Sequence, residues 1–222
     1  MTNNKLFTLN STNIFGSIFA TICLFIIEIM FIAAFNNFIE DPFVAYCAVY
    51  AIFILIIYIK ERKTIDSNIR NFKNDIKGKV KNIIIVTTTL LLAEFILNYV
   101  LIRLLGHGPT NNDLIIDALQ NNNIFIFMLY SFILCPILEG LFFTYPYKNN
   151  KNKLAAYISM SIVFALMHIT SATSLFDTLY LIPYLCMTFA FNYGFYKTNN
   201  VFVSIGVHTI NNIIAYVLLF IM

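Results

Sequence analysis

Residues 131–147, SFILCPILEGLFFTYPY, form an almost wholly apolar stretch that contains one carboxylate, Glu139. No other charged residue lies within eight positions on either side of it. A charged side chain near the centre of a bilayer costs about 2.5–3.5 kcal/mol on insertion scales, so it is a functional candidate when its segment spans a membrane. The rest of the sequence must show that this segment does so.

The composition is that of a membrane protein. Of the 222 residues, 59% are hydrophobic and only 11% are charged, whereas about 25% are charged in a typical soluble domain. The four cysteines lie singly in apolar runs, which predicts neither a disulfide framework nor a structural zinc site. A net charge of +3 gives no sign of a nucleic-acid partner. We predict an all-α, polytopic membrane helix bundle, formed by one integral membrane domain over residues 1–222.

Seven apolar runs approach the length of about 20 residues that a spanning helix needs. We therefore predict about seven transmembrane helices, at residues 13–35, 43–59, 82–105, 121–147, 154–170, 175–196 and 201–222.

Between the second and third runs lies a basic segment, residues 60–81, which holds eight cations and three acids. Its apolar residues recur at spacings of three and four, which is typical of an amphipathic helix on the membrane surface. A docking site for an acidic partner is the alternative interpretation.

The basic residues also orient the chain. With the N-terminus in the cytoplasm, the segments 60–81 and 148–153 and Lys197 all lie inside, as the positive-inside rule requires. The acidic turns then lie outside: Glu40 with Asp41, Asp113 with Asp117, and Asp177. We predict a multi-pass protein of the cell membrane with an extracytoplasmic C-terminus. The abundance of Asn, Ile and Lys suggests an AT-rich, bacterial genome.

Four polar residues capable of catalysis lie in the later runs: Glu139, His168, His208 and Asn212. With a helical rise of about 1.5 Å per residue, all four lie about 12–22 Å from the cytoplasmic ends of their helices. His208 and Asn212 are four positions apart and share a helix face. Either one alone is more often a group that hydrogen-bonds a neighbouring helix. Together they predict one shared cavity that opens, or can be opened, from the cytoplasm.

The order of these residues resembles a known family. Pro136 and Glu139 precede GLFF, FALMH ends at His168, and HTINN runs from His208 to Asn212. This set resembles the CPBP family of CAAX prenyl-protein endopeptidases and bacteriocin-processing and immunity proteins, whose motifs are EExxxR, FxxxH and HxxxN. The resemblance implies that these four polar residues are catalytic and that the glutamate activates water.

The resemblance covers residues 121–222 as the core and leaves 1–120 as variable N-terminal helices. The first motif departs from the family pattern, because Gly140 stands where the family has a second Glu and Thr144 where it has Arg. One carboxylate and one cation are thus absent together, which leaves the formal charge of the site unchanged.

The leading hypothesis is an intramembrane endopeptidase that processes a peptide or membrane-protein substrate. Glu139 would be the general base, His168 would help to hold the water, and His208 and Asn212 would stabilise the oxyanion. No cofactor is required, although a zinc ion held by Glu139, His168 and His208 is chemically possible.

Two other hypotheses remain open. One is a catalytically inactive protein of the same fold that acts as a membrane binding or bacteriocin-immunity protein. The other is a small transporter with a proton path through Glu28, Glu94 and Glu139. The endopeptidase hypothesis expects Glu28 and Glu94 to lie outside the cluster of catalytic residues, whereas the transporter hypothesis expects them to face Glu139.

Overall fold

The computed structural model describes residues 13–108, 116, 123–147, 149–169 and 176–221. Within these ranges the chain forms seven helices and no strands. The fourth is a single rod in which a π-helical turn, Tyr130–Leu134, joins two α-helical parts, α5 and α6. The helices are α1 (Ile14–Asn36), α2 (Pro42–Asn74), α3 (Ile76–Leu105), α5 (Ile124–Leu129), α6 (Cys135–Thr144), α7 (Lys153–His168), α8 (Leu181–Thr198) and α9 (Val201–Ile221).

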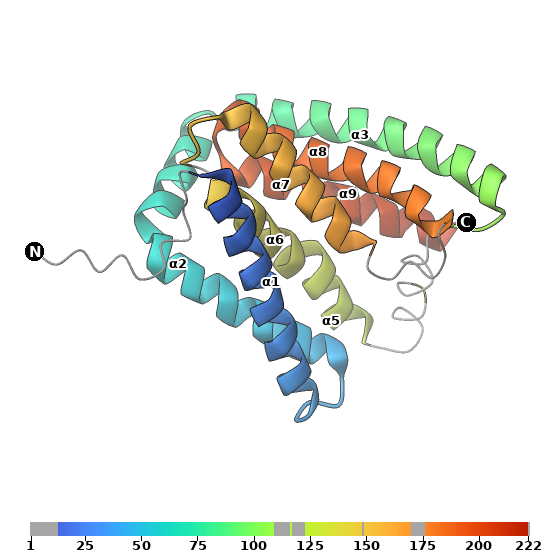
Figure 1. The fold of residues 1–222 in the computed structure, drawn as a ribbon, viewed down its shortest axis with the longest axis horizontal. Coiled ribbons are helices and arrows are strands. Elements are labelled where there is room, and N and C mark those ends of the chain that lie inside the picture. Colours follow the sequence, from blue (N-terminus) through green and yellow to red (C-terminus); the bar gives the residue numbers. More distant parts are fainter. Residues whose placement is uncertain (1–12, 109–115, 117–122, 148, 170–175, 222) are drawn as a thin grey trace, which may run out of the picture.

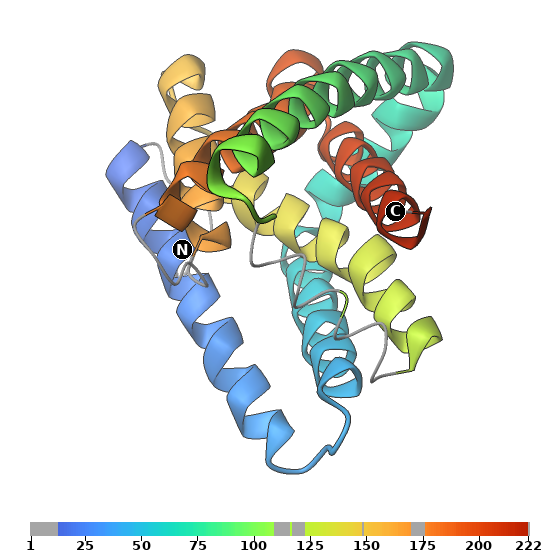
Figure 2. The same cartoon turned by 90° about the vertical axis from the view of Figure 1, so that its right-hand side faces the viewer.

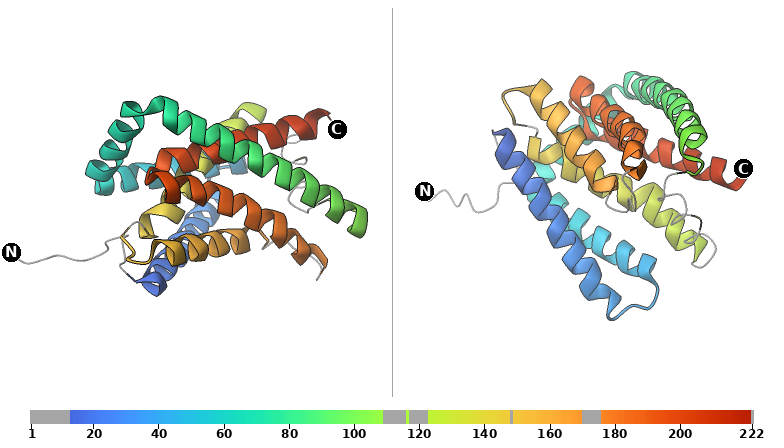
Figure 3. Two further views of the ribbon diagram at one scale, coloured as in Figure 1. Left: turned by 90° about the horizontal axis from the view of Figure 1, so that it is seen from above. Right: turned by 45° about the vertical axis from the view of Figure 1, so that its right-hand side comes forward.

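The helices form one bundle around α6 and α8 (Figure 1). Helix α8 packs against α7, α3 and α9, and α6 packs against α9, α2 and α7. In the view from above, α3 crosses over α8 and α9 (Figure 3). Helices α1 and α2 pair with each other, and the turn that joins them projects from the bundle (Figure 2). The described parts of the four later helices thus lie side by side.

Five of the described helices are long and apolar enough to cross a membrane: α1, α2, α3, the α5–α6 rod and α9. Helix α7 is apolar but shorter, with 16 residues. Large apolar side chains face outward on the spanning helices, for example Phe15, Phe95 and Phe125, which are 80%, 71% and 79% exposed. Helices that are apolar on all faces are typical of a membrane bundle. The predicted fold class is confirmed.

The basic segment 60–81 is helical over most of its length, but Asp75 interrupts it, so it is not one helix, and its position on a membrane surface stays a prediction. Helix α2 continues through it to Asn74, with non-helical backbone angles at Glu61 that mark a kink. Asp75 then ends α2 and starts α3, because its carboxylate accepts a hydrogen bond from the backbone N–H of Gly78 at 3.1 Å. In α2 beyond the kink, Ile65 is buried in the core, whereas the last part of the segment is the first turns of α3.

The helix in the predicted sixth span begins later than predicted, and it is not among the five described helices that are long and apolar enough to cross a membrane. Residues Phe176–Tyr180 form a 3₁₀ helix, and α8 starts at Leu181 with Pro183 in its first turn. Proline is tolerated there because the first N–H groups of a helix have no partner within the helix. The predicted turn at 171–174 and the acids Asp113 and Asp117 lie outside the described residues.

The π-helical turn has a local cause in Pro136. Proline lacks the N–H that would bond to the carbonyl four residues earlier, and the backbone N–H of Cys135 bonds to the carbonyl of Tyr130, five residues earlier. Ser131 donates its hydroxyl to the carbonyl of Phe127 at 2.6 Å. The wide turn adds one residue to the rod just before α6, and it therefore sets the direction in which Glu139 points.

Helix α9 approaches α6 closely at Gly140. A Cβ atom at this glycine would lie 2.6 Å from Cγ1 of Ile205, whose side chain is buried. Gly140 therefore permits the contact between α6 and α9 that brings the faces bearing Glu139 and His208 together.

We expect Gly140→Ala to lower the melting temperature of the purified protein in detergent. Overpacking costs about 1–3 kcal/mol, against about 1 kcal/mol gained from helix propensity when alanine replaces a helical glycine. The comparison variant is Gly206→Ala, where the new Cβ would lie 2.7 Å from the terminal Cδ1 of Ile83 and 3.3 Å from its Cγ1, so that the closest atom is one that can move by rotation of the side chain. In an Ile205→Ala background, Gly140→Ala should no longer destabilise. An equal effect in both backgrounds would contradict this account of the contact.

Candidate active site

Glu139 of α6 and His208 of α9 face each other in the interior. Oε2 of Glu139 lies 3.7 Å from Nε2 of His208, and their side chains are 20% and 6% exposed. Among the described residues, this carboxylate oxygen is buried and has no hydrogen-bond partner. A buried polar atom without a partner is costly and is a recognised mark of a functional site. The two groups are close enough for one reacting molecule to contact both.

An aromatic wall holds His208 in place. Its ring stacks on Phe191 of α8, with centroids 4.2 Å apart and planes at 19°. Phe164 of α7 lies 6.0 Å from the same imidazole and stacks on Phe143 of α6 at 4.0 Å. Because Phe164 and Phe191 are almost fully buried, their packing leaves the imidazole little freedom to turn. The FxxxH motif thus supplies His168 and also the ring of Phe164, which supports the imidazole of His208.

His168 is the last residue of α7 and lies beside this wall. Its Nδ1 is 2.9 Å from the carbonyl oxygen of Phe164, four residues earlier. Since a carbonyl only accepts hydrogen bonds, Nδ1 carries the proton and Nε2 keeps a lone pair. The ring also lies 5.5 Å from that of Tyr184 and interacts electrostatically with His208. His168 is therefore suited to accept a hydrogen bond from a water at this site.

Asn212 lies one turn after His208 and binds the π-helical turn. Its Nδ2 donates to the backbone carbonyl of Ser131 at 2.9 Å. One of its two amide hydrogens is therefore used to hold α9 against the rod, and the second stays available. The structure thus pairs Glu139 with His208 and couples His208 to His168, whereas Asn212 holds α9 to the π-helical turn.

The zinc alternative gains no geometric support. In the part of the chain that the structure describes, no group of three His, Cys, Asp or Glu residues is arranged to hold a metal ion.

Of the two other intramembrane glutamates in the transporter hypothesis, Glu28 interacts with Glu139. Glu28 of α1 is 5% exposed, and it interacts with the hydroxyl of Tyr50 and electrostatically with Glu139. Glu28 is thus coupled to Glu139, as the transporter hypothesis expects, although it contacts none of the four predicted site residues directly in the described structure. Glu94 instead interacts with Cys186 of α8. No spacing rule could have identified Glu28, because the helix that carries it is more than 100 positions from Glu139.

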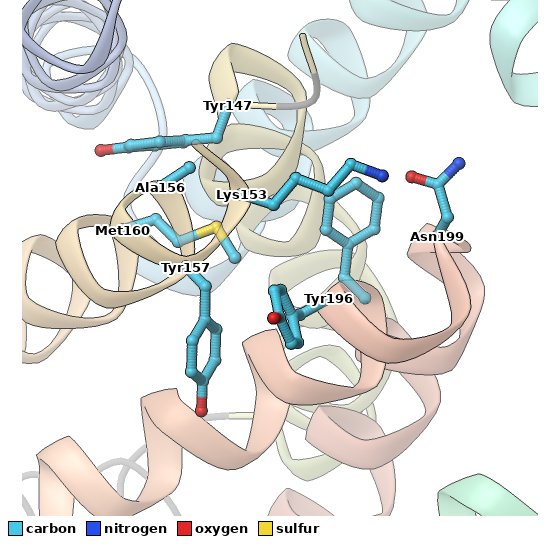
Figure 4. A pocket seen from close by; sticks show the side chains of 8 residues that line it. Tyr147, Lys153, Ala156, Tyr157, Met160, Tyr196 and Asn199 are labelled. Atoms are coloured by element: carbon cyan, nitrogen blue, oxygen red, sulfur yellow. The ribbon is translucent and has the colours of Figure 1, made fainter. Parts of the chain in front are cut away.

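Two pockets in the described structure lie away from these residues. The smaller, with a volume of about 30 Å³, lies between the start of α7 and the end of α8, where Lys153 and Asn199 line it (Figure 4). The larger, about 280 Å³, is lined mainly by polar side chains, including Thr144 and Asn68. Thr144 is one and a half turns beyond Glu139 on α6. The single cavity around the four predicted residues stays a prediction.

We expect Asn212→Leu to destabilise the protein by about 1–3 kcal/mol, because the buried carbonyl of Ser131 loses its donor. The matched control is the preceding residue: the Oδ1 atom of Asn211 is buried and has no hydrogen-bond partner in the described structure. Asn211→Leu should therefore cost less. Thermal unfolding of both variants in the same detergent measures the difference, and equal losses would show that the bond to Ser131 contributes nothing.

A comparison with protein families gives a match over residues 121–214, to the family described as type II CAAX prenyl endopeptidase Rce1-like. Comparisons with curated proteins and with solved structures gave no significant match. The matched residues run from the start of the α5–α6 rod into α9 and include all four predicted site residues. Residues 121–214 thus match the model of the Rce1-like family, a type II CAAX prenyl endopeptidase family within the CPBP group, and the resemblance drawn from the motifs is confirmed over this part of the chain.

Proposed function

We propose that this protein is an intramembrane endopeptidase in which Glu139 activates the water that cleaves the peptide bond. One observation carries the proposal: an unpartnered, buried carboxylate oxygen lies 3.7 Å from an imidazole nitrogen, within the region that matches an endopeptidase family. A buried carboxylate is a better base than a solvated one. The same interior strengthens every donor aimed at developing charge.

The residues suggest a complete sequence of proton transfers. Glu139 takes a proton from a water that also donates to Nε2 of His168, and the water oxygen bonds to the carbonyl carbon. The carbonyl oxygen becomes an oxyanion, which accepts hydrogen bonds from Nε2–H of His208 and the free amide hydrogen of Asn212. The protonated Glu139 then gives its proton to the amide nitrogen as the C–N bond breaks. Water is the only co-reactant.

The family name gives the first substrate class to test. It describes endopeptidases that act on CAAX prenyl sequences, so a peptide that ends in a prenylated cysteine followed by three residues is a suitable probe. A lipid-modified chain end is compatible with a site inside an apolar bundle. We further propose that the N-terminus is cytoplasmic, that the C-terminus is extracytoplasmic, and that substrate approaches through the polar pocket beside Thr144.

A second candidate is a binding or immunity protein of the same fold without peptidase activity. Packing at Gly140 favours it, because Ile205 fills the space that a second glutamate would need. One amide hydrogen of Asn212 is also held by Ser131. Both features allow α6 and α9 to pack closely around the site. Activity measurements decide between the two functions.

We expect Glu139→Gln to abolish cleavage of the prenylated peptide while the protein still folds, because an amide of the same shape cannot take a proton from water. Glu94→Gln is the matched control, since it also neutralises an intramembrane glutamate but should retain activity. His208→Ala should lower kcat by about 10²–10³, the usual cost of losing one oxyanion donor. Cleavage is followed by mass spectrometry with the protein in nanodiscs.

The complementary experiment needs no known substrate. Peptides processed in cells that contain the wild type are compared with those in cells that contain Glu139→Gln. A well-expressed Glu139→Gln variant that keeps full biological activity would reject the peptidase and favour the binding protein.

A further inference from the structure

A second carboxyl group lies inside the bundle and has no part in the mechanism above. Glu28 is in α1, outside the region that matches the family, and its side chain is as inaccessible as the apolar core. Placing an ion in such surroundings costs several kcal/mol unless partners compensate for the lost water. The position of this group therefore requires an explanation.

A line of polar side chains connects this group to the active site. Glu28 interacts with the hydroxyl of Tyr50, which accepts a hydrogen bond from Tyr130 at 3.5 Å. The two phenol rings pack edge to face, with centroids 5.1 Å apart. Tyr130 in turn interacts with Cys135, and the thiol of Cys135 interacts with Glu139, one turn further along the same rod. The line thus runs from α1 through α2 into the rod that carries the proposed base.

The other described side chains around Glu139 and Tyr130 do not link the two carboxyl groups, so this line is the connection between them. His208 faces Glu139 from α9, and Tyr216 of α9 interacts with Cys135 and Glu139 while it is hydrogen-bonded to Ser131. Tyr46 packs against Tyr130 at 5.2 Å. Within the described residues, the side chains that interact with this line thus include no Lys or Arg.

Two carboxyl groups that share a dry interior do not both hold a full charge at low cost. Hydrogen bonds through hydroxyl and thiol groups let them adjust to each other, since buried networks polarise cooperatively. A change in the charge or hydrogen bonding of one carboxyl group therefore affects the other carboxyl group.

We propose that Glu28 is a positioning residue for Glu139 and acts through the line Tyr50, Tyr130 and Cys135. It anchors the phenols, which hold the thiol against the proposed base and so fix the orientation of its carboxylate. The catalytic consequence rests on the proposed peptidase function, whereas the coupling between the two carboxyl groups does not.

The coupling is measured by infrared spectroscopy of the purified full-length protein in nanodiscs. In each background, the carboxyl band of Glu139 is obtained by subtracting the spectrum of the same variant with Glu139→Gln added. Three backgrounds are compared with the wild type: Glu28→Gln, Tyr50→Phe and, as the matched control, Glu94→Gln. Tyr50→Phe removes only one hydroxyl and keeps the ring packing, so it tests the line even if Glu28→Gln fails to fold.

We expect the Glu139 band to shift in Glu28→Gln and in Tyr50→Phe and to stay unchanged in Glu94→Gln. An unchanged band in Tyr50→Phe overturns the proposal, and so does an equal shift in all three backgrounds, since that would reflect a general change of structure.

Cleavage of the prenylated peptide gives the second readout. Glu28→Gln and Tyr50→Phe should lower kcat by about tenfold to 100-fold, the range expected for a misplaced catalytic group, with KM unchanged. The double variant should lose little more than either single variant, because both act through one line. Full kcat in both single variants overturns the positioning role. A shifted band in a protein that cleaves nothing rejects the peptidase but retains the coupling.

Discussion

The close contact between α6 and α9 at Gly140 is the constraint on which the site depends. Helices approach this closely only where one of them lacks a side chain, and here Ile205 fills the space above the glycine. The next residue toward the N-terminus is Glu139, and one turn beyond Ile205 is His208. The contact that closes the bundle therefore also sets the separation of the two groups proposed for catalysis.

The surrounding apolar bundle makes this polar site effective. Phe143, Phe164 and Phe191 form a continuous wall that ends on the imidazole of His208. Electrostatic interactions are several times stronger in such an interior than in water. The same surroundings penalise every unpaired polar atom, which explains why the backbone carbonyl exposed by the π-helical turn is bound by Asn212. Stability and chemistry thus use the same few polar groups.

Much of this architecture can be predicted from the sequence. The composition and the apolar runs predict an all-α membrane bundle, and the ordered motifs predict the family. The break between α2 and α3 is harder to predict, because one side chain, Asp75, ends one helix and starts the next inside a continuous amphipathic pattern. The π-helical turn depends on Pro136 in an otherwise regular run, and periodicity does not detect one added residue.

The role of Glu28 cannot be predicted from spacing at all. Tyr50 comes from α2, whereas Tyr130 and Cys135 come from the rod, and only the packing of α1 and α2 against the rod brings them together with Glu28. Glu94 has the same residue type in a similar helix but a different neighbour. The difference between these two glutamates is a property of the fold and not of the local sequence.

The most direct test of the central claim is a single turnover in water labelled with oxygen-18. If Glu139 acts as a base, the label enters the new carboxyl group of the peptide product in the first turnover, and Glu139 itself stays unlabelled. Mass spectrometry of the product and of the protein fragment that contains Glu139 measures both. Label in the carboxyl group of Glu139 would show that it attacks the substrate as a nucleophile, and this result would contradict the account.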